Sequence, residues 1–274
     1  MLIKFLGTAA AEGVPSFFCD CEACQKTRRL GGKNLRSRSQ ALIDGKLLID
    51  FGPDTYFHLT KYGLNLTDME NCLITHVHED HLLECELKYL GAWAGHPHKD
   101  YTFTLHGSSD LKTTGENCIP VSDGHLFLNV VEPFVPFKAG DYTVTALRAW
   151  HGTKNPYIYI ISNGEHTVLY ANDTDVFPEE TWEYLEKAKP HFDLVAMDCT
   201  NGNSWKITYR GHMGLIQNVE CKERLEKLGI IDEKTVLLLN HFSHNGIDVV
   251  YDDFTEIAKK NGFLATYDGM EINL

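Results

Sequence analysis

Short apolar runs separated by turn residues fill the first part of the chain, and this pattern is typical of β-strands. The dipeptides Asp44-Gly45 and Asn163-Gly164 stand between such runs and predict tight hairpin turns. The predicted strands of this part are Leu2–Leu6, Gln40–Ile43, Lys46–Asp50, Asn71–Thr75, Thr102–His106, Leu126–Val131, Tyr142–Leu147, Tyr157–Ser162 and His166–Ala171.

Helical and strand-like stretches alternate in the second part of the chain. The expected helices are about Asp80–Trp93, Glu179–Ala188, Met213–Leu228 and Asp252–Asn261, and the later strands are Asp193–Asp198, Thr235–Asn240 and Phe263–Tyr267. This order predicts an α/β fold of two mixed β-sheets packed face to face, with helices on the outer faces. Neither an internal repeat nor a Pro/Ser-rich linker divides residues 1–274, so we expect a single domain.

Composition narrows the class of protein. Apolar residues make up 43% of the chain and charged residues 23%, which excludes disordered and collagen-like proteins. Apolar runs stay far below the roughly 20 residues that a membrane span needs. The first residues combine neither a basic region nor an apolar signal region, so we expect a cytoplasmic protein without a membrane partner.

The charge balance is acidic but uneven. The chain has 25 basic and 38 acidic residues, a net charge of −13, which argues against a broad nucleic-acid-binding surface. Six positive charges nevertheless lie in the thirteen residues from Lys26 to Arg38, without one acidic residue. This segment is either a solvated loop or a local site that attracts anions.

The strongest chemical signal is the segment Thr75–His81, which reads THVHEDH. Side chains alternate along a strand, so His76 and His78 point the same way, while Asp80 and His81 face the same pocket from the following turn. Imidazoles and carboxylates are ligands of Zn²⁺, Mn²⁺ and Fe²⁺. The spacing therefore predicts a metal site.

Three further ligand-type residues follow predicted strands. His151, Asp173 and His241 each come at or just after the carboxyl end of an apolar strand, where loops can present side chains to a shared cleft. Each of them alone is more typical of a core or loop residue. Together with the histidine segment they are expected to complete a site for two metal ions.

Eight cysteines in a chain without an export signal indicate reduced thiols or metal ligands. Cys19, Cys21 and Cys24 form a C-x-C-x₂-C cluster, which suggests a structural zinc that needs one more ligand. His244, three residues after His241, is the candidate fourth ligand. Unrelated loop cysteines are the alternative interpretation.

The histidine segment resembles the H-x-H-x-D-H motif of the metallo-β-lactamase superfamily, whose fold is an αββα sandwich. The implied ligand sets are His76, His78 and His151 for one ion, Asp80, His81 and His241 for the other, and Asp173 as the bridge between them. The two ions would share a hydroxide that attacks the substrate.

A narrower resemblance points to the PhnP-like branch, the phosphoribosyl 1,2-cyclic phosphate phosphodiesterases. It rests on Gly7-Thr8, Glu12–Pro15, Cys19–Cys24, Val131–Phe134, Tyr170–Thr174, Met197–Thr200, His241–His244 and Tyr267–Ile272. The branch implies a structural Zn²⁺ on the cysteine cluster, within a zinc-binding loop at about residues 16–38. It also suggests a homodimer.

Catalytic roles follow from the same resemblance. His212 occupies the place of a histidine implicated in catalysis and is expected either to protonate the leaving alkoxide or to donate to a non-bridging oxygen, with a structural histidine at a helix N-terminus as the alternative. Asp80 is expected to be both a metal ligand and a catalytic residue. Asp50 is expected either to hydrogen-bond a liganding imidazole or to be a simple turn residue. Leu82–Leu87 and Asn201–Tyr209 depart from the pattern of the family, in places where substrate shape would be set.

The expected function is hydrolysis of a small cyclic phosphate of a sugar or nucleotide by two divalent ions, Mn²⁺, Zn²⁺ or Fe²⁺. The first alternative is a nuclease that processes the 3′ end of tRNA, which would need a basic, flexible arm. The others are a thioester or lactone hydrolase of the same superfamily and a non-catalytic binding protein. A small phosphodiester is the expected partner, and nucleic acid is not.

Overall fold

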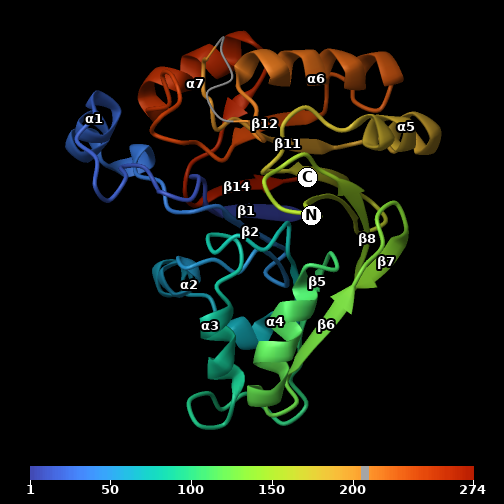
Figure 1. Ribbon diagram of the computed structural model, residues 1–274. Helices are drawn as coiled ribbons and strands as arrows, with labels where there is room; N and C mark the ends of the chain where they lie inside the picture. Colours follow the sequence, from blue (N-terminus) through green and yellow to red (C-terminus); the bar gives the residue numbers. More distant parts are fainter. Residues whose placement is uncertain (205–209) are drawn as a thin grey trace.

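The computed structural model describes residues 1–204 and 210–274, so the expected departure over Asn201–Tyr209 lies in part outside the described residues. Two seven-stranded mixed sheets face each other (Figure 1). The first sheet has the order β14 (Met270–Asn273), β1 (Leu2–Gly7), β2 (Gln40–Ile43), β3 (Leu47–Ile49), β4 (Asn71–Leu73), β5 (Phe103–Gly107) and β6 (Leu126–Val130). The second has the order β13 (Leu264–Ala265), β12 (Val236–Asn240), β11 (Leu194–Asp198), β10 (Thr167–Ala171), β9 (Tyr157–Ser162), β8 (Tyr142–Arg148) and β7 (Pro136–Ala139).

Helices cover both outer faces of the sheets. Figure 1 shows α5 to α7 above the second sheet and α2 to α4 beside the first, while α1 stands apart at one end. The helices are α1 (Glu22–Leu30), α2 (Thr55–Tyr62), α3 (Glu84–Leu87), α4 (Leu111–Cys118), α5 (Glu179–Ala188), α6 (Leu215–Leu228) and α7 (Tyr251–Lys260). The predicted αββα sandwich is confirmed. Every helix among the described residues is too short or too polar to span a membrane.

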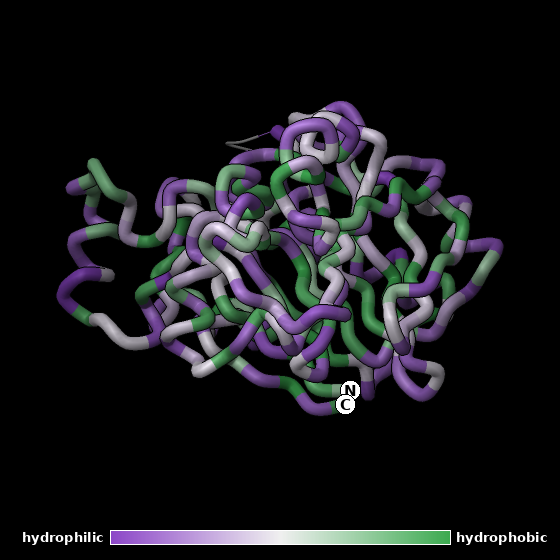
Figure 2. The backbone as a smooth tube through the Cα atoms, turned by 90° about the horizontal axis from the view of Figure 1, so that it is seen from below, coloured by the Kyte–Doolittle hydropathy of each residue, from purple (hydrophilic) through white to green (hydrophobic). Residues whose placement is uncertain are grey.

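The core has three apolar layers, and alternation along each strand assigns its side chains to them. In β12, Leu238 faces the layer between the sheets, whereas Leu237 and Leu239 face the layer beneath α5, α6 and α7. A third layer joins the outer face of the first sheet to α2, α3 and α4. In Figure 2 several long hydrophobic stretches of the tube run through the middle of the molecule. Burial on both faces explains why the strands read as continuous apolar runs.

Each sheet contains a parallel run. The strands β3 to β6 are parallel, as are β10 to β13, and the remaining pairs are antiparallel. Parallel strands bring their carboxyl ends to one edge of a sheet, where ligand sites form. The topology therefore places the segments that follow β4, β10, β11 and β12 at the carboxyl-end edges of the two sheets.

The helix expected from about Asp80 to Trp93 is wrong in its extent. The structure has only the four-residue α3 and a 3₁₀ turn at Lys88–Leu90 there. The main chain around His81 is instead bonded to Phe51: Phe51 N donates to His81 O at 2.7 Å, and Leu83 N donates to Phe51 O at 2.8 Å. These bonds use groups that a helix would need and hold the histidine segment against the first sheet.

Five α-helices and strands of the described residues were not predicted: α1, α2, α4, β7 and β14. Helix α1 gives little hydrophobic signal because Cys24 and Thr27 are its only buried residues. It projects from the body in both views, and we call residues 16–34 the arm (Figure 1 and Figure 2). The zinc-binding loop expected at about 16–38 is thus partly helical. A single domain over the whole chain stays a prediction.

Candidate active site

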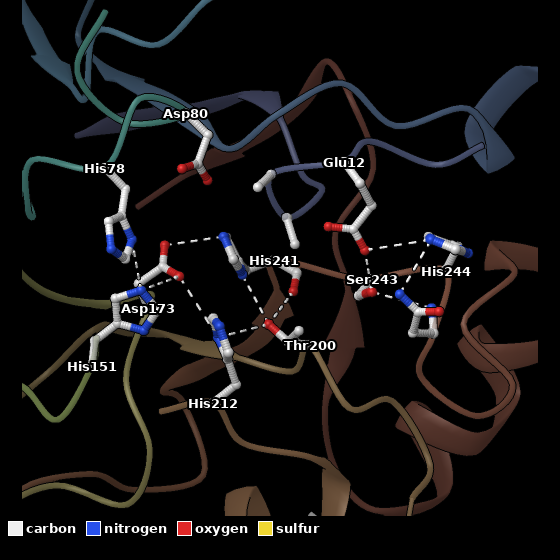
Figure 3. A pocket seen from close by; sticks show the side chains of 13 residues that line it. Glu12, His78, Asp80, His151, Asp173, Thr200, His212, His241, Ser243 and His244 are labelled. Atoms are coloured by element: carbon white, nitrogen blue, oxygen red, sulfur yellow. Dashed lines mark hydrogen bonds and ion pairs between the residues drawn. The ribbon is translucent and has the colours of Figure 1, made fainter. Parts of the chain in front are cut away.

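One pocket of about 430 Å³ collects side chains that are far apart in the sequence (Figure 3). His78 and Asp80 come from the segment after β4, His151 from the segment after β8, Asp173 from the segment after β10, and His241 from the end of β12. Both sheets therefore contribute to one site, as the strand-end argument predicts.

Three histidines form a first group of possible metal ligands. One ring nitrogen of each of His76, His78 and His151 lies within 4.8 Å of the others. His78 Nδ1 is 2.9 Å from His76 Nε2 and 3.1 Å from His151 Nε2. The set is the one that the resemblance implies for one ion.

Asp80, His81 and His241 form the second group, again within 4.8 Å of one another. Asp173 lies between the two groups. Its Oδ2 is 2.7 Å from His81 Nε2 and 3.0 Å from His241 Nε2, whereas its Oδ1 is 3.8 Å from His151 Nε2. A carboxylate with one oxygen toward each group is placed as a bridging ligand would be.

The chemistry of the donor set tests whether this arrangement fits a cation. His81 Nε2 and His241 Nε2 are buried and lie 2.7 and 3.0 Å from Asp173 Oδ2, and Asp80 Oδ2 lies 3.0 Å from His81 Nε2. Two imidazoles and two carboxylates thus meet at one largely buried point. Imidazole nitrogens and a carboxylate oxygen suit a divalent metal ion, and the donor set fits one.

Asp50 forms a hydrogen bond with His81, one of the residues of the second group. Its Oδ2 accepts a hydrogen bond from His81 Nδ1 at 2.7 Å, while Oδ1 accepts from Thr75 N at 2.8 Å. The contact with an imidazole expected from the sequence is therefore present. In the neutral ring this bond holds the proton on Nδ1, so that Nε2 is the nitrogen that would act as a ligand.

Asp198 is a site residue that the sequence analysis missed. Its Oδ2 lies 2.7 Å from His212 Nδ1, and Thr200 Oγ1 lies 3.1 Å from the same nitrogen and 2.9 Å from His241 Nδ1. Asp198 ends β11, which lies between β10, followed by Asp173, and β12, followed by His241. The strand-end rule, applied to this middle strand, points to it.

Carboxylates raise the pKa of two histidines of the site, His212 and His81. Burial lowers the pKa of His212, but the Asp198 carboxylate more than reverses this and raises it to about 9. Burial likewise lowers the pKa of His81, and the carboxylates of Asp173, Asp80 and Asp50 raise it well above its usual value. His212 is therefore protonated at neutral pH and can give up a proton.

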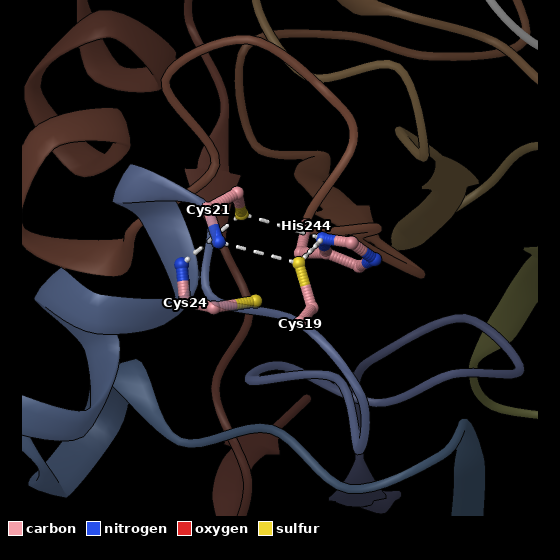
Figure 4. Close-up of side chains that lie close together, drawn as sticks. All are labelled: Cys19, Cys21, Cys24 and His244. Atoms are coloured by element: carbon pink, nitrogen blue, oxygen red, sulfur yellow. Dashed lines mark hydrogen bonds between the residues drawn. The ribbon is translucent and has the colours of Figure 1, made fainter.

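The cysteine cluster forms a separate site beside the pocket (Figure 4). Cys19 Sγ and Cys21 Sγ lie 3.5 and 3.6 Å from His244 Nδ1, and Cys24 completes a group whose ligand atoms lie within 4.8 Å. All eight cysteines are free thiols. Three sulfurs and one imidazole suit a tetrahedral zinc.

The thiols of this cluster differ in their acidity. Burial raises the pKa of Cys21, but hydrogen bonds from the Cys24 N–H and from His244 outweigh it and lower the pKa to about 6. Burial raises the pKa of Cys24 to about 12. One thiolate is thus formed at neutral pH without a cation, and the buried Cys24 needs one to ionise.

The basic segment Lys26–Arg38 is largely used within the molecule. Lys26 pairs with Asp253 at 2.6 Å and Arg38 pairs with Asp54 at 2.9 Å. Arg36 is buried and donates to Thr266 O at 2.6 Å. These contacts favour a structural role for the segment over a site that attracts anions.

Comparison with known proteins identifies the class. Residues 46–242, more than half of the chain, match the family described as Beta-lactamase superfamily domain. The chain therefore belongs to the β-lactamase superfamily, in agreement with the fold and the site.

Three individual proteins that resemble the chain are each less than 25% identical to it. Ribonuclease Z of Listeria welshimeri is 24% identical over 196 residues, which cover 69% of this chain and 58% of that protein. The chain thus spans less than two thirds of the length of this curated relative. Zn²⁺-bound PqqB from Methylobacterium extorquens superposes with a TM-score of 0.77 at 17% identity, covering both chains completely. A diphosphatase of the PhnP family superposes with a TM-score of 0.75 at 18% identity, covering 100% of this chain and 97% of that one. These two structures share the fold.

Proposed function

We propose that the protein is a metal-dependent phosphodiesterase that hydrolyses a small cyclic phosphate of a sugar or nucleotide. The observation that carries the proposal is the pair of three-ligand groups on either side of Asp173, whose Oδ2 lies 2.7 Å from His81 Nε2 and 3.0 Å from His241 Nε2. Phosphoryl transfer in proteins commonly uses such paired ion sites.

The ligand sets assign the residues to their roles. The residues that would hold the ions are His76, His78 and His151 on one side, Asp80, His81 and His241 on the other, and Asp173 between them. Zn²⁺, Mn²⁺ or Fe²⁺ would supply activation of a water molecule and positive charge for the phosphoryl oxygens. Cys19, Cys21, Cys24 and His244 would hold a structural Zn²⁺.

His212 is assigned as the proton donor to the leaving oxygen. It lines the pocket, and its Nδ1 is held by Asp198 at 2.7 Å, which fixes the orientation of the ring. The carboxylate also keeps the imidazole protonated at neutral pH, because the pKa of His212 is raised to about 9. A positioned imidazolium of this kind is suited to general acid catalysis.

Several features support a small substrate. A pocket of about 430 Å³ lies in the range of small-molecule sites. The diphosphatase of the PhnP family, as a neighbour of the same fold, agrees with phosphate chemistry. The branch-specific cysteine cluster is also assembled, because Cys19 and Cys21 lie beside His244.

A ribonuclease Z-type nuclease is the second candidate, favoured by the similarity to the Listeria enzyme. The net charge of −13 speaks against it, since RNA binding depends on neutralising phosphates. The basic residues that could form a gripping arm are largely paired with Asp253, Asp54 and main-chain oxygens. We therefore rank the small cyclic phosphate first.

Elemental analysis of the purified protein, with hydrolysis of bis(p-nitrophenyl) phosphate measured on the same sample, tests the proposal. We expect about three metal ions per chain, of which one resists chelation, together with turnover. Metal-free protein without turnover after addition of Mn²⁺ or Zn²⁺ would contradict it. Metal-loaded protein that cleaves a tRNA precursor but no small phosphodiester would favour the nuclease.

A further inference from the structure

The pocket continues beyond the histidine and aspartate groups to a second wall. Glu12 lies in this wall, next to Ser243 and His244, on the side where the cysteine cluster lies (Figure 3 and Figure 4). The side chain of Glu12 keeps 29% of its surface exposed, so a molecule in the pocket can reach it. The proposed reaction gives this carboxylate no role.

The main chain holds Glu12 in a defined position. Ala10 N donates to Phe242 O at 3.0 Å, and Gly13 N donates to Ala10 O at 2.9 Å, which closes a tight turn around Glu12. Gly13 has a φ of +70°, a value that favours glycine. Val14 and Arg36 bond to each other through their main chains at 2.8 and 3.0 Å. The carboxylate is therefore placed before any ligand enters.

The two oxygens of Glu12 have different surroundings. Oε1 accepts a hydrogen bond from Ser243 Oγ, which is itself oriented by Asn245 N at 3.1 Å. Oε2 makes no hydrogen bond to the described residues, and Figure 3 shows it pointing away from Ser243 and His244, toward the side where His241 lies. One oxygen is thus anchored, and the other faces the pocket as an acceptor.

We propose that Glu12 Oε2 accepts a hydrogen bond from a hydroxyl group of the substrate while the phosphoryl group lies at the histidine and aspartate groups. This inference rests on the proposed function and narrows its substrate class to phosphate esters of sugars that present a free hydroxyl group to this wall of the pocket. An anionic carboxylate forms strong charge-assisted bonds with hydroxyl donors. It also disfavours a second phosphate or carboxylate at this end of the substrate, so it selects by repulsion as well as by attraction.

A purely structural role toward the cysteine cluster is less consistent with the geometry. Glu12 Oε1 is 3.8 Å from His244 Nε2, which is beyond hydrogen-bond distance. Loss of the carboxylate is therefore not expected to release zinc from the cluster. Zinc content and melting temperature of the variants separate the two roles.

Binding of two phosphate monoesters to the metal-loaded protein, measured by calorimetry, tests the inference without requiring turnover. The probes are ribose 5-phosphate and ethyl phosphate, which carry the same phosphate charge, but only the first has sugar hydroxyls. We expect the wild type to bind ribose 5-phosphate at least about tenfold more tightly. Glu12→Gln and Glu12→Ala are expected to remove most of this preference and to bind ethyl phosphate no more weakly than the wild type does.

Glu22→Gln is the matched control, because it removes the same charge from an exposed position of α1 outside the pocket. It is expected to retain the preference. Equal affinity of the wild type for both probes, or a preference that survives in both Glu12 variants, would overturn the inference. Hydrolysis of bis(p-nitrophenyl) phosphate, measured in parallel, tests the proposed function separately. Turnover without a preference for ribose 5-phosphate would refute only the role of Glu12. A preference for ribose 5-phosphate without turnover would refute only the proposed reaction.

Discussion

The two candidate metal sites are adjacent in space but are built in different ways. The histidine and aspartate site takes its residues from segments after β4, β8, β10 and β12, so both sheets must be packed before it exists. The cysteine site takes three residues from the six between Cys19 and Cys24 and one, His244, from the body. The histidine and aspartate site forms only when the whole fold is in place, whereas the cysteine site attaches the arm to the body of the molecule. Loss of one residue should therefore affect chemistry in the first site and structure in the second.

The largest effect is expected from His78→Ala. His78 is exposed at the pocket, so its removal takes away a ligand while leaving the core intact. We expect hydrolysis of bis(p-nitrophenyl) phosphate to fall by more than about a hundredfold, since even outer partners of metal ligands cost 10- to 100-fold. The melting temperature should change little. His96→Ala, at an exposed histidine outside both sites, serves as the control; equal activity of the two variants would refute the assignment.

A smaller and different effect is expected from Cys21→Ser. It should lower the zinc content by one ion per chain and lower the melting temperature by about 5 °C, because the arm loses its attachment to the body. The matched substitution is Cys85→Ser, at an exposed cysteine outside the cluster. Unchanged zinc content and melting temperature in the Cys21 variant would refute a structural zinc at the cysteine site.

The smallest expected effect is the pH dependence of stability that comes from His106, a buried histidine outside both sites. Burial lowers the pKa of His106 to about 4, and the ring is held neutral between Asn71 and Asn129. A histidine with a depressed folded pKa stabilises the protein above its unfolded pKa of about 6.5, and this stability is lost as the pH falls toward 4. We expect about 1 kcal/mol less free energy of unfolding at pH 5.5 than at pH 6.5 from this residue.

Urea unfolding at the two pH values measures this effect, with His106→Gln as the comparison. The variant should lose less stability than the wild type over the same interval, by about 1 kcal/mol. Parallel losses in both proteins would show that His106 does not remain neutral in the folded state. Metal content should be the same in both, which keeps this test independent of the two sites.

The sequence was sufficient for residues whose placement depends on a single strand end. His76, His78, Asp80 and His81 lie in one short segment that follows β4, so their spacing alone brings them to the same end of the first sheet. The alternation expected for His76 and His78 does not apply, because β4 ends at Leu73. Asp198 lacks such a local pattern, because it ends β11 as an isolated carboxylate. Its role depends on the order of β10, β11 and β12 in the sheet, which spacing along the chain does not specify.

Other features depend on contacts that span most of the chain. Glu12 and Ser243 are 231 residues apart, and only the packing of the loop at residues 10–13 against the end of β12 brings them together. The wrong helix over Asp80–Trp93 has a similar cause, since bonds to Phe51 outweigh the local preference for a helix. Helix α1 was missed for the opposite reason: its segment is strongly polar, and Cys24 and Thr27 are the only residues it buries.

The position of β1 between β2 and β14 also affects the order in which the molecule can be completed. Ile3 pairs with Ile43 on one side and with Ile272 on the other, so one neighbour is available early and the other only after nearly the whole chain exists. At about 5–20 residues per second, synthesis of the intervening chain takes on the order of 10 to 50 seconds. During that interval the outer edge of β1 has unpaired main-chain groups, the kind of edge that other strands can join. The first strand of the emerging chain is therefore open to wrong pairing on one side until β14 pairs with it.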